Sequence, residues 1–508
     1  MFSVLAKHMI ELLLGIDVGT SNVKAVLATP DGTVMAQAAA ALPIHHLRPG
    51  WVEQDPADWW RGVIAVTRAV IERAQADPAY VAGIGVSGQG CAVTLIDQTG
   101  DVVRPAIIGM DSRSEPQCAQ LRAACGDAIL RLNGKQPAPY NADPVLLWLQ
   151  QHEPESIKRA QTSLTTTGYI TYKLTDEQVL NVSDASILFA FDLHTGHWSD
   201  ELIDAFGLPR RLYPRVAPCS EVVGGLTAAA AELLGLRSGI PVVAGGEDTS
   251  SAGLAMGVVR PGQALLSLGT AGTVYVVPDD LIVHPDLLTF EHVLPDRLLF
   301  GGSMVAAGAA LHWCRDLLGS DCSFDELTAL AAEVGPGSDG VIFLPYLSGE
   351  LQPINDGNAR GVFFGLSMST TRAQSVRAVL EGTAYAIAHN LRVAQETGAR
   401  IDELRAVGGP TRSALWCQII ADVTGRSVAV MDDAAGAPLG NALLAAVGAG
   451  VIADAGIVAS RAARLERSYA PREAEHAHYQ QMFALYQQLY PALKAQFAAH
   501  AALPHWIR

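Results

Sequence analysis

Basic residues are scarce in this sequence. Lysine and arginine together number 35 against 51 aspartates and glutamates, the formal net charge is −16, and no basic run or basic helix face stands out. Binding along a nucleic-acid backbone requires a positive surface, so a nucleic-acid partner is not expected. Small phosphorylated ligands are not excluded, because backbone N–H groups and a metal ion can hold phosphates on an acidic protein.

Signals for disulfides, zinc binding, membrane insertion and secretion are also missing. The seven cysteines are odd in number and contain no Cys-x-x-Cys pair, so we interpret them as free thiols in a reducing compartment. No apolar run reaches about 18 residues, and the stretch 1–15 lacks the core and cleavage site of a signal peptide. We therefore expect a soluble, cytoplasmic protein without a membrane partner. Met9 is an alternative start, which would make residues 1–8 an unstructured extension.

Two common nucleotide-binding signatures are absent or out of place. No G-x-x-x-x-G-K-[ST] phosphate loop occurs. The segment Gly83 to Gly88 fits the dinucleotide pattern G-x-G-x-x-G, with Asp111 at about the expected distance. Its first two glycines, however, lie inside a predicted strand, and a second strand follows where the dinucleotide fold has a helix. The sequence therefore argues against a P-loop enzyme and against a dehydrogenase.

What the sequence does contain is a large hydrophobic fraction and many glycines. Its 508 residues are 49% hydrophobic and include 48 glycines, several of them in short motifs after apolar runs. This length exceeds one ordinary core, so we expect an α/β protein of two large domains, 1–253 and 254–508. The boundary is predicted within 252–260, and a cleft between the domains is expected.

The first motif is a predicted strand–turn–strand over residues 12–29. Its turn contains Gly19, Thr20 and Ser21, preceded by Asp17. A glycine turn lets backbone N–H groups approach a phosphate, the two hydroxyls add donors, and the aspartate can hold Mg²⁺ through water. The alternative is an ordinary hairpin with a solvated aspartate.

The same pattern returns in the second half of the chain. Residues 264–277 again predict a strand, a Gly-Thr turn at Gly269 and Thr270, and a second β-branched strand. Two such turns, one in each half, could hold a polyphosphate between them, and the pair is more specific than either turn. Chance similarity of two short hairpins is the alternative.

A third glycine motif, Gly408-Gly409, follows an apolar run and precedes Arg412 and Ser413. Ser413 can cap a helix that runs to Thr424 and ends before a glycine. Glycines at this place let a flat ring such as adenine lie on the backbone near the helix N-terminus. The alternative is a tight connection between a strand and a helix.

Asp248 follows the apolar run 242–246 at the end of a predicted strand. A carboxylate at the C-terminal end of a strand, beside glycines that admit a ligand, is well placed for general-base catalysis. The alternative is that Asp248 only caps a helix over 249–254. Near the C-terminus, the aromatic residues Tyr479, Phe483, Tyr486 and Tyr490 predict the core-facing side of a helix.

Taken together, these segments resemble the FGGY carbohydrate kinases, over almost the whole chain from Leu12 onward. The markers, in chain order, are GIDVGTSNVK (15–24), WVEQDPADWW (51–60), DSR (111–113), GGEDTSSAG (245–253), LLSLGTAG (265–272), FLPYLSGE (343–350), GVFFGL (361–366), RAVLEG (377–382) and GGPTRS (408–413). The resemblance implies two ribonuclease-H-like domains of the actin and hexokinase type, which bind a small sugar or polyol and MgATP. A homodimer is compatible with it.

The resemblance also implies residue roles. Asp248 would be the general base and, with Asp17, would hold Mg²⁺. The ATP-binding set would be Gly19, Thr20, Ser21, Gly269, Thr270, Gly408, Gly409, Arg412 and Ser413. The sugar would contact Gln89, Gly90, Cys91, Asp111, Asp248 and Thr249.

Xylulose kinases are the members that the chain resembles most, so the implied reaction converts D-xylulose to D-xylulose 5-phosphate. Several pocket positions depart from their pattern, however: Gly90 and Cys91 stand in place of Met-His, Gly109 in place of Trp, and Thr249 in place of Asn. The sugar pocket is thus either wider or refilled from another loop. Gluconate, another ketose or a polyol remain alternative substrates, and an actin-like or chaperone-like ATPase is the alternative from another class.

Overall fold

The computed structural model describes residues 11–318, 322–432 and 435–503, so the question of the Met9 start lies outside the described residues. Contacts divide the chain into two compact units. Unit 1 contains the chain up to Val259 together with Thr289–Leu298 and Ala434–Ala463, and unit 2 contains the rest. The first boundary between the units, after Val259, lies within the stretch 252–260 where the sequence predicts a boundary. The sequence does not predict that Thr289–Leu298 and Ala434–Ala463 belong to unit 1.

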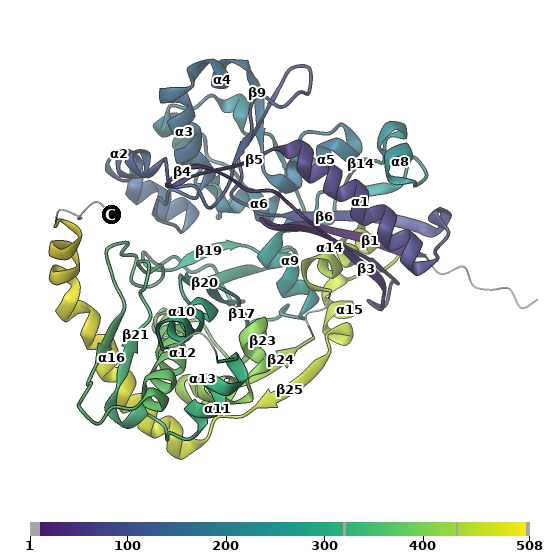
Figure 1. The fold of residues 1–508 in the computed structure, drawn as a ribbon. Coiled ribbons are helices and arrows are strands. Elements are labelled where there is room, and N and C mark those ends of the chain that lie inside the picture. Colours follow the sequence, from purple (N-terminus) through teal and green to yellow (C-terminus); the bar gives the residue numbers. More distant parts are fainter. Residues whose placement is uncertain (1–10, 319–321, 433–434, 504–508) are drawn as a thin grey trace, which may run out of the picture. The chain divides into compact units, whose positions relative to one another are not determined.

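Unit 1 is built on a seven-stranded sheet (Figure 1). Its strands are β1 (Leu12–Val18), β2 (Asn22–Ala28), β3 (Val34–Ala41), β6 (Val81–Gly88), β14 (Val222–Gly225), β15 (Pro241–Val243) and β16 (Gly246–Glu247). Along the sheet the order is β14-β15-β6-β1-β2-β3, with β16 paired to β6. β1, β2 and β3 form an antiparallel meander, and β6 and β15 continue it in parallel.

Smaller sheets and helices complete unit 1. The remaining strands are β4 (His45–Arg48), β5 (Trp51–Gln54), β7 (Thr94–Asp97), β8 (Ala106–Ile107), β9 (Ala160–Leu164), β10 (Val179–Asn181), β11 (Phe191–Asp192), β12 (His197–Trp198) and β13 (Arg215–Ala217). The helices are α1 (Pro56–Ala74), α2 (Glu115–Asn133), α3 (Ala142–His152), α4 (Pro154–Arg159), α5 (Thr166–Thr175), α6 (Val182–Ile187), α7 (Asp200–Phe206), α8 (Ala228–Leu234), α9 (Asp248–Ala255), α14 (Gly436–Gly448) and α15 (Ala455–Ala462).

A second seven-stranded sheet, in the order β19-β20-β18-β17-β23-β24-β25, repeats this topology. Its strands are β17 (Gln263–Leu268), β18 (Gly272–Val276), β19 (Leu288–Glu291), β20 (Leu298–Met304), β23 (Glu403–Val407), β24 (Ser427–Met431) and β25 (Leu465–Tyr469), and a hairpin is formed by β21 (Ile342–Leu344) and β22 (Val362–Phe364). The helices are α10 (Gly308–Leu318), α11 (Phe324–Ala332), α12 (Arg372–Glu396), α13 (Ala414–Thr424) and α16 (Glu473–Ala501). β20, β18 and β17 are antiparallel neighbours, and β23 and β24 continue in parallel. Both units therefore have the ribonuclease-H-like arrangement, and the two predicted hairpins occupy equivalent places.

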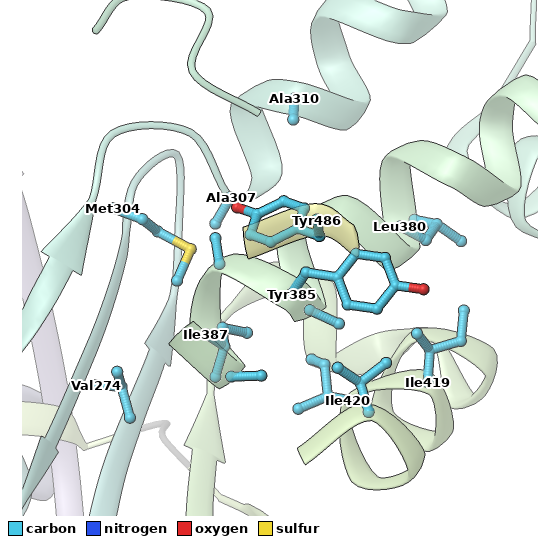
Figure 2. Close-up of a cluster of buried hydrophobic side chains, with 14 of the residues drawn as sticks. Val274, Met304, Ala307, Ala310, Leu380, Tyr385, Ile387, Ile419, Ile420 and Tyr486 are labelled. Carbon is cyan, nitrogen blue, oxygen red and sulfur yellow. The ribbon is translucent and has the colours of Figure 1, made fainter. Parts of the chain in front are cut away.

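The core of unit 2 contains the predicted aromatic stripe of α16. Tyr479, Phe483, Tyr486 and Tyr490 are all buried. Figure 2 shows Tyr486 beside Tyr385 of α12, and the two ring centroids lie 5.3 Å apart. The helix predicted after Ser413 is also confirmed, because the Ser413 side chain caps α13 and the left-handed Gly425 ends it.

Candidate active site

Asp248 is the first residue of α9 and not its cap. The cap is Glu247, whose Oε2 accepts a hydrogen bond of 2.8 Å from the backbone N–H of Ser250. The capping alternative for Asp248 is therefore wrong, because the preceding carboxylate already takes that place. Thr249 Oγ1 donates to Asp248 Oδ1 at 3.0 Å, which orients the Asp248 carboxyl group. The Asp248 carboxyl group is thus oriented by Thr249, and it does not cap α9, because Glu247 does.

The surroundings of Asp248 favour proton binding. Burial raises the pKa of Asp248 well above its usual value, and the neighbouring Glu247 carboxyl raises it further. Burial and the charge of Asp248 raise the pKa of Asp17 to about 6, although Ser87 Oγ donates to Asp17 Oδ1 at 2.8 Å. The two carboxylates predicted to hold the metal therefore lie close enough to repel each other, and both belong to unit 1.

This pair fits a magnesium ion. A divalent cation would offset the repulsion between the buried Asp17 and the half-buried Asp248, which both offer acidic oxygen donors. Among the residues that the structure describes, no group of three or more His, Cys, Asp or Glu side chains is arranged to hold a metal. Mg²⁺ is commonly bound through one or two carboxylates, with phosphate and water oxygens completing the shell.

The first phosphate turn is tied to the predicted sugar residue Gln89. Gly19 N–H closes the turn by donating to Asn22 O at 3.0 Å. Thr20 Oγ1 donates to Gln89 Oε1 at 3.3 Å, and Gln89 Nε2 donates to Gln54 Oε1 at 2.7 Å. Gln54 returns to the turn, since its Nε2 donates to Thr20 O at 2.8 Å. Sequence reasoning missed this role of Gln54, whose only signal was its place inside WVEQDPADWW.

Asp111 has a different environment from the other predicted sugar residues. It is 2% exposed, and its oxygens accept from the backbone N–H of Val52 at 2.6 Å and from the Arg113 guanidinium at 2.8–3.0 Å. Arg113 also pairs with Glu53 at 2.8 Å. Asp111 thus organises a buried ion-pair network, and its contact with substrate stays a prediction.

Replacing Asp111 with asparagine is expected to destabilise the protein by up to roughly 3–5 kcal/mol, because the buried Arg113 guanidinium loses one of its two carboxylate partners and keeps only Glu53. Urea unfolding followed by circular dichroism measures this loss. Glu155→Gln is the matched control, because it removes an ion pair with Lys158 whose side chains are 70% and 83% exposed. The control should cost less than about 1 kcal/mol. Equal losses in both variants would contradict a stabilising role for the buried network.

Cys91 and Asp184 lie close enough to the Asp248 carboxyl group to interact with it electrostatically. Burial raises the pKa of the Cys91 thiol to about 12, and the charges of Glu247, Asp248 and Asp184 act in the same direction, so the thiol stays protonated at neutral pH. Asp184 Oδ2 accepts from Thr165 Oγ1 at 2.9 Å, whereas its buried Oδ1 has no hydrogen-bond partner among the described residues. Sequence reasoning missed Asp184, because nothing in the pattern around it marks a site.

Unit 2 contains a cavity of about 600 Å³ that brings together most of its predicted ATP-binding residues. Gly269, Thr270, Gly409, Arg412 and Ser413 line it, and further wall residues come from three helices, namely Leu311, His312, Phe324, Thr328 and Trp416. A cavity of this size with mixed aromatic and polar walls suits a nucleoside.

Gly408 is not among the residues that line this cavity. It has a φ of +104°, and a Cβ atom there would lie 1.9 Å from Leu268 O. Gly408 therefore allows its loop to approach β17 closely. This agrees with the alternative interpretation of this glycine, a tight connection between a strand and a helix. The loop is also braced by Arg467 of β25, a residue that sequence reasoning missed, whose Nη2 donates to Thr411 O at 3.0 Å.

Comparison with known proteins identifies both halves of the chain. Residues 12–255 match the N-terminal domain of the FGGY family of carbohydrate kinases, and residues 264–449 match the C-terminal domain. A xylulose kinase of Escherichia coli (strain K12) is 34% identical over 491 residues, covering 95% of this chain and all of the relative. A glycerol kinase of Citrifermentans bemidjiense is 32% identical over 476 residues, covering 91% of this chain and 94% of the relative.

The solved structures agree with the sequence relatives. The crystal structure of xylulose kinase from Rhodospirillum rubrum superposes with a TM-score of 0.91 and 33% identity, covering 96% of this chain and all of that chain. No helix in the described part of the chain has the length and apolar character needed to cross a membrane.

Proposed function

Because this chain belongs to the FGGY family of carbohydrate kinases, we propose that it transfers the γ-phosphoryl group of ATP to D-xylulose and forms D-xylulose 5-phosphate. The observation that carries the catalytic part is the position of Asp248, a half-buried carboxylate at the start of α9 that is not needed as the helix cap, because Glu247 takes that place. The proposed substrate rests on the xylulose kinases among the relatives, two of which are 31% and 34% identical over 95% of the chain.

In the proposed reaction, Asp248 accepts the proton of the attacking hydroxyl. Its raised pKa makes it a stronger base once ionised, because burial destabilises the charged form. Phosphoryl transfer otherwise depends on positioning and charge neutralisation more than on covalent chemistry. Mg²⁺, held by Asp17 and Asp248, would neutralise charge on the phosphate oxygens.

The remaining residues position the two substrates. The Gly19–Ser21 and Gly269–Thr270 turns would bind the phosphates through backbone N–H groups and hydroxyls. The adenosine would occupy the cavity of unit 2, on Gly409 and near Ser413. Gln89 would face the sugar, since Gln54 and Thr20 already orient its amide.

The test is an ADP-release assay with D-xylulose, glycerol, gluconate and a set of ketoses and polyols. We expect D-xylulose to give the highest kcat/KM and ³¹P NMR to show a phosphomonoester at carbon 5. A preference for glycerol or gluconate would overturn the proposed substrate but not the kinase activity. ADP release that no acceptor stimulates, together with polymerisation or peptide binding, would instead favour an ATPase switch.

We further propose that the enzyme works in the cytoplasm, because all seven cysteines are free thiols and disulfides are rare in reducing compartments. Size-exclusion chromatography would show whether the enzyme forms the homodimer with which the family resemblance is compatible.

A further inference from the structure

The space beside Gly90 is already filled. A Cβ atom at this position would lie 2.4 Å from Ile187 Cδ1, 3.2 Å from Glu247 Cγ and 3.4 Å from Asp184 Oδ1. Real Cβ contacts below 3.0 Å are essentially never found, so Ile187 occupies the volume that a larger residue at position 90 would need. Loss of a large side chain at Gly90 has therefore not left a hole.

Gly109 is different. A Cβ atom there would have one neighbour within 4 Å among the described residues, Cys91 Cβ at 3.3 Å. The position is half-buried, and Met110 beside it is 53% exposed. The two glycines thus differ: the space beside Gly90 is filled by Ile187, whereas the space beside Gly109 has one close neighbour, Cys91.

We propose that Ile187 is a specificity-determining residue, which forms the wall of the acceptor site that residue 90 does not supply. Its side chain lies against Gly90, the residue after the predicted sugar residue Gln89, and it is half-buried, so part of its surface stays exposed. Glu247, the residue before the proposed base, lies beside the same position, 3.2 Å from a Cβ atom added at Gly90. The inference rests on the proposed function and refines it. The acceptor would contact the Ile187 side chain near the proposed base, and the glycine at position 90 would not enlarge the acceptor site.

The helix that carries Ile187 is held firmly, as a pocket wall requires. Asn181 caps α6 by accepting from the Asp184 N–H at 2.8 Å, and Asn181 Nδ2 donates to Asp184 Oδ2 at 2.8 Å. At the other end of α6, Asn141 Nδ2 donates to Ile187 O at 3.1 Å. Both ends of this short helix are therefore anchored by buried side chains, and Ile187 cannot simply swing away with its backbone.

The closing experiment measures acceptor preference. Wild type, Ile187→Val and Ile187→Ala are assayed with D-xylulose, D-fructose and D-sedoheptulose, which add one carbon at a time. Since a single methylene in a pocket changes discrimination by about 10–200-fold, Ile187→Ala is expected to raise the relative kcat/KM for the longer ketoses at least about tenfold. Ile187→Val removes the Cδ1 methyl that contacts Gly90 and should shift the preference in the same direction but less.

A second arm tests whether Ile187 and residue 90 share one volume. Gly90→Met alone should lower kcat/KM for D-xylulose at least about tenfold, and Gly90→Met with Ile187→Ala should recover most of that loss. If the two residues did not share one volume, the fold-changes in kcat/KM of the single variants would multiply in the double variant, and no recovery would be seen. Thermal unfolding of each variant checks that it is folded.

If the ratio of kcat/KM for the longer ketoses to kcat/KM for D-xylulose stays within about twofold of wild type in folded Ile187→Ala and Ile187→Val, Ile187 does not determine specificity. If the wild type prefers another acceptor, the proposed substrate fails, and the same ratios measured against that acceptor still decide the role of Ile187. If the wild type neither phosphorylates nor binds any of the sugars by calorimetry, both proposals are overturned.

Discussion

Asp248→Asn is expected to lower kcat for sugar phosphorylation by about 10²–10⁴-fold, the range that general-base catalysis contributes. Asparagine keeps the size of the side chain and can still accept from Thr249 Oγ1, as Asp248 does at 3.0 Å. It cannot take the proton of the attacking hydroxyl. Binding of ADP without Mg²⁺ should change little, because the cavity lined by Gly409 and Ser413 is built from unit 2 alone. Steady-state kinetics and calorimetry with ADP measure the two effects separately.

Asp200→Asn is the matched control for this variant. Asp200 is also the first residue of a helix in unit 1, α7, and its helix is likewise capped by the preceding residue, Ser199. Because its side chain is 84% exposed, the control should keep kcat within about twofold. Turnover of Asp248→Asn at a similar level would remove Asp248 from the role of base.

The same variant has an expected effect on stability, with a definite sign. The pKa of Asp248 is raised in the folded protein, so the folded state holds a proton that the unfolded state releases at lower pH. Stability is therefore lost as the pH rises above the ordinary aspartate range. Asparagine removes this loss, so the melting temperature of Asp248→Asn should exceed that of wild type by more at pH 8 than at pH 5. A variant that is less stable at pH 8 would contradict this electrostatic account.

Local patterns predicted the local parts of this molecule well. The hairpins around Gly19 and Gly269 were found because a strand, a glycine turn and a second strand are adjacent in sequence. The helix from Ser413 to Gly425 was found because its cap and its stop are both encoded at its ends. In these places the deciding contacts join residues only a few positions apart.

Long-range contacts decide the features that were missed. The wall at Gly90 comes from Ile187, almost a hundred positions later, and no local pattern near either residue indicates the pairing. Cap preference favours aspartate over glutamate, yet Glu247 is the cap of α9 and accepts from the Ser250 N–H, so propensity alone gave the wrong cap. The return of Ala434–Ala463 to unit 1 depends on packing across more than 400 residues of chain.

The position of Ala434–Ala463 in unit 1 also explains the glycines of β6 that match the dinucleotide pattern G-x-G-x-x-G. α14 packs on β1 and β6 in unit 1, where Figure 1 shows the yellow-green helix beside these strands. A Cβ atom at Gly85 would lie 2.2 Å from Asn441 O, and one at Gly83 would lie 2.9 Å from Ala445 O. The glycines of β6 therefore allow close contact between a helix and a sheet, which accounts for their spacing without a dinucleotide site.

Gly15→Ala is the sharpest test of this packing. A Cβ atom at Gly15 of β1 would lie 1.7 Å from Pro438 O and 2.8 Å from Ala442 N, both backbone atoms of α14 that cannot rotate away. Either the helix or the strand must shift, so we expect a loss of stability of about 3 kcal/mol or more, at the upper end of overpacking effects. Hydrogen exchange should increase across α14, and kcat should fall because the shifted strand carries Asp17.

Gly126→Ala is the matched control in the same unit. Gly126 lies in α2, and the nearest atom to an added Cβ is Arg122 Cβ at 3.9 Å, an ordinary contact. Alanine is the better helix former by about 1 kcal/mol, so this variant should be as stable as wild type or more stable. If Gly15→Ala matched the control in unfolding and exchange, α14 would not be seated on the sheet of unit 1. The segment after residue 434 would then belong with the rest of the second half of the chain, as the sequence alone suggests.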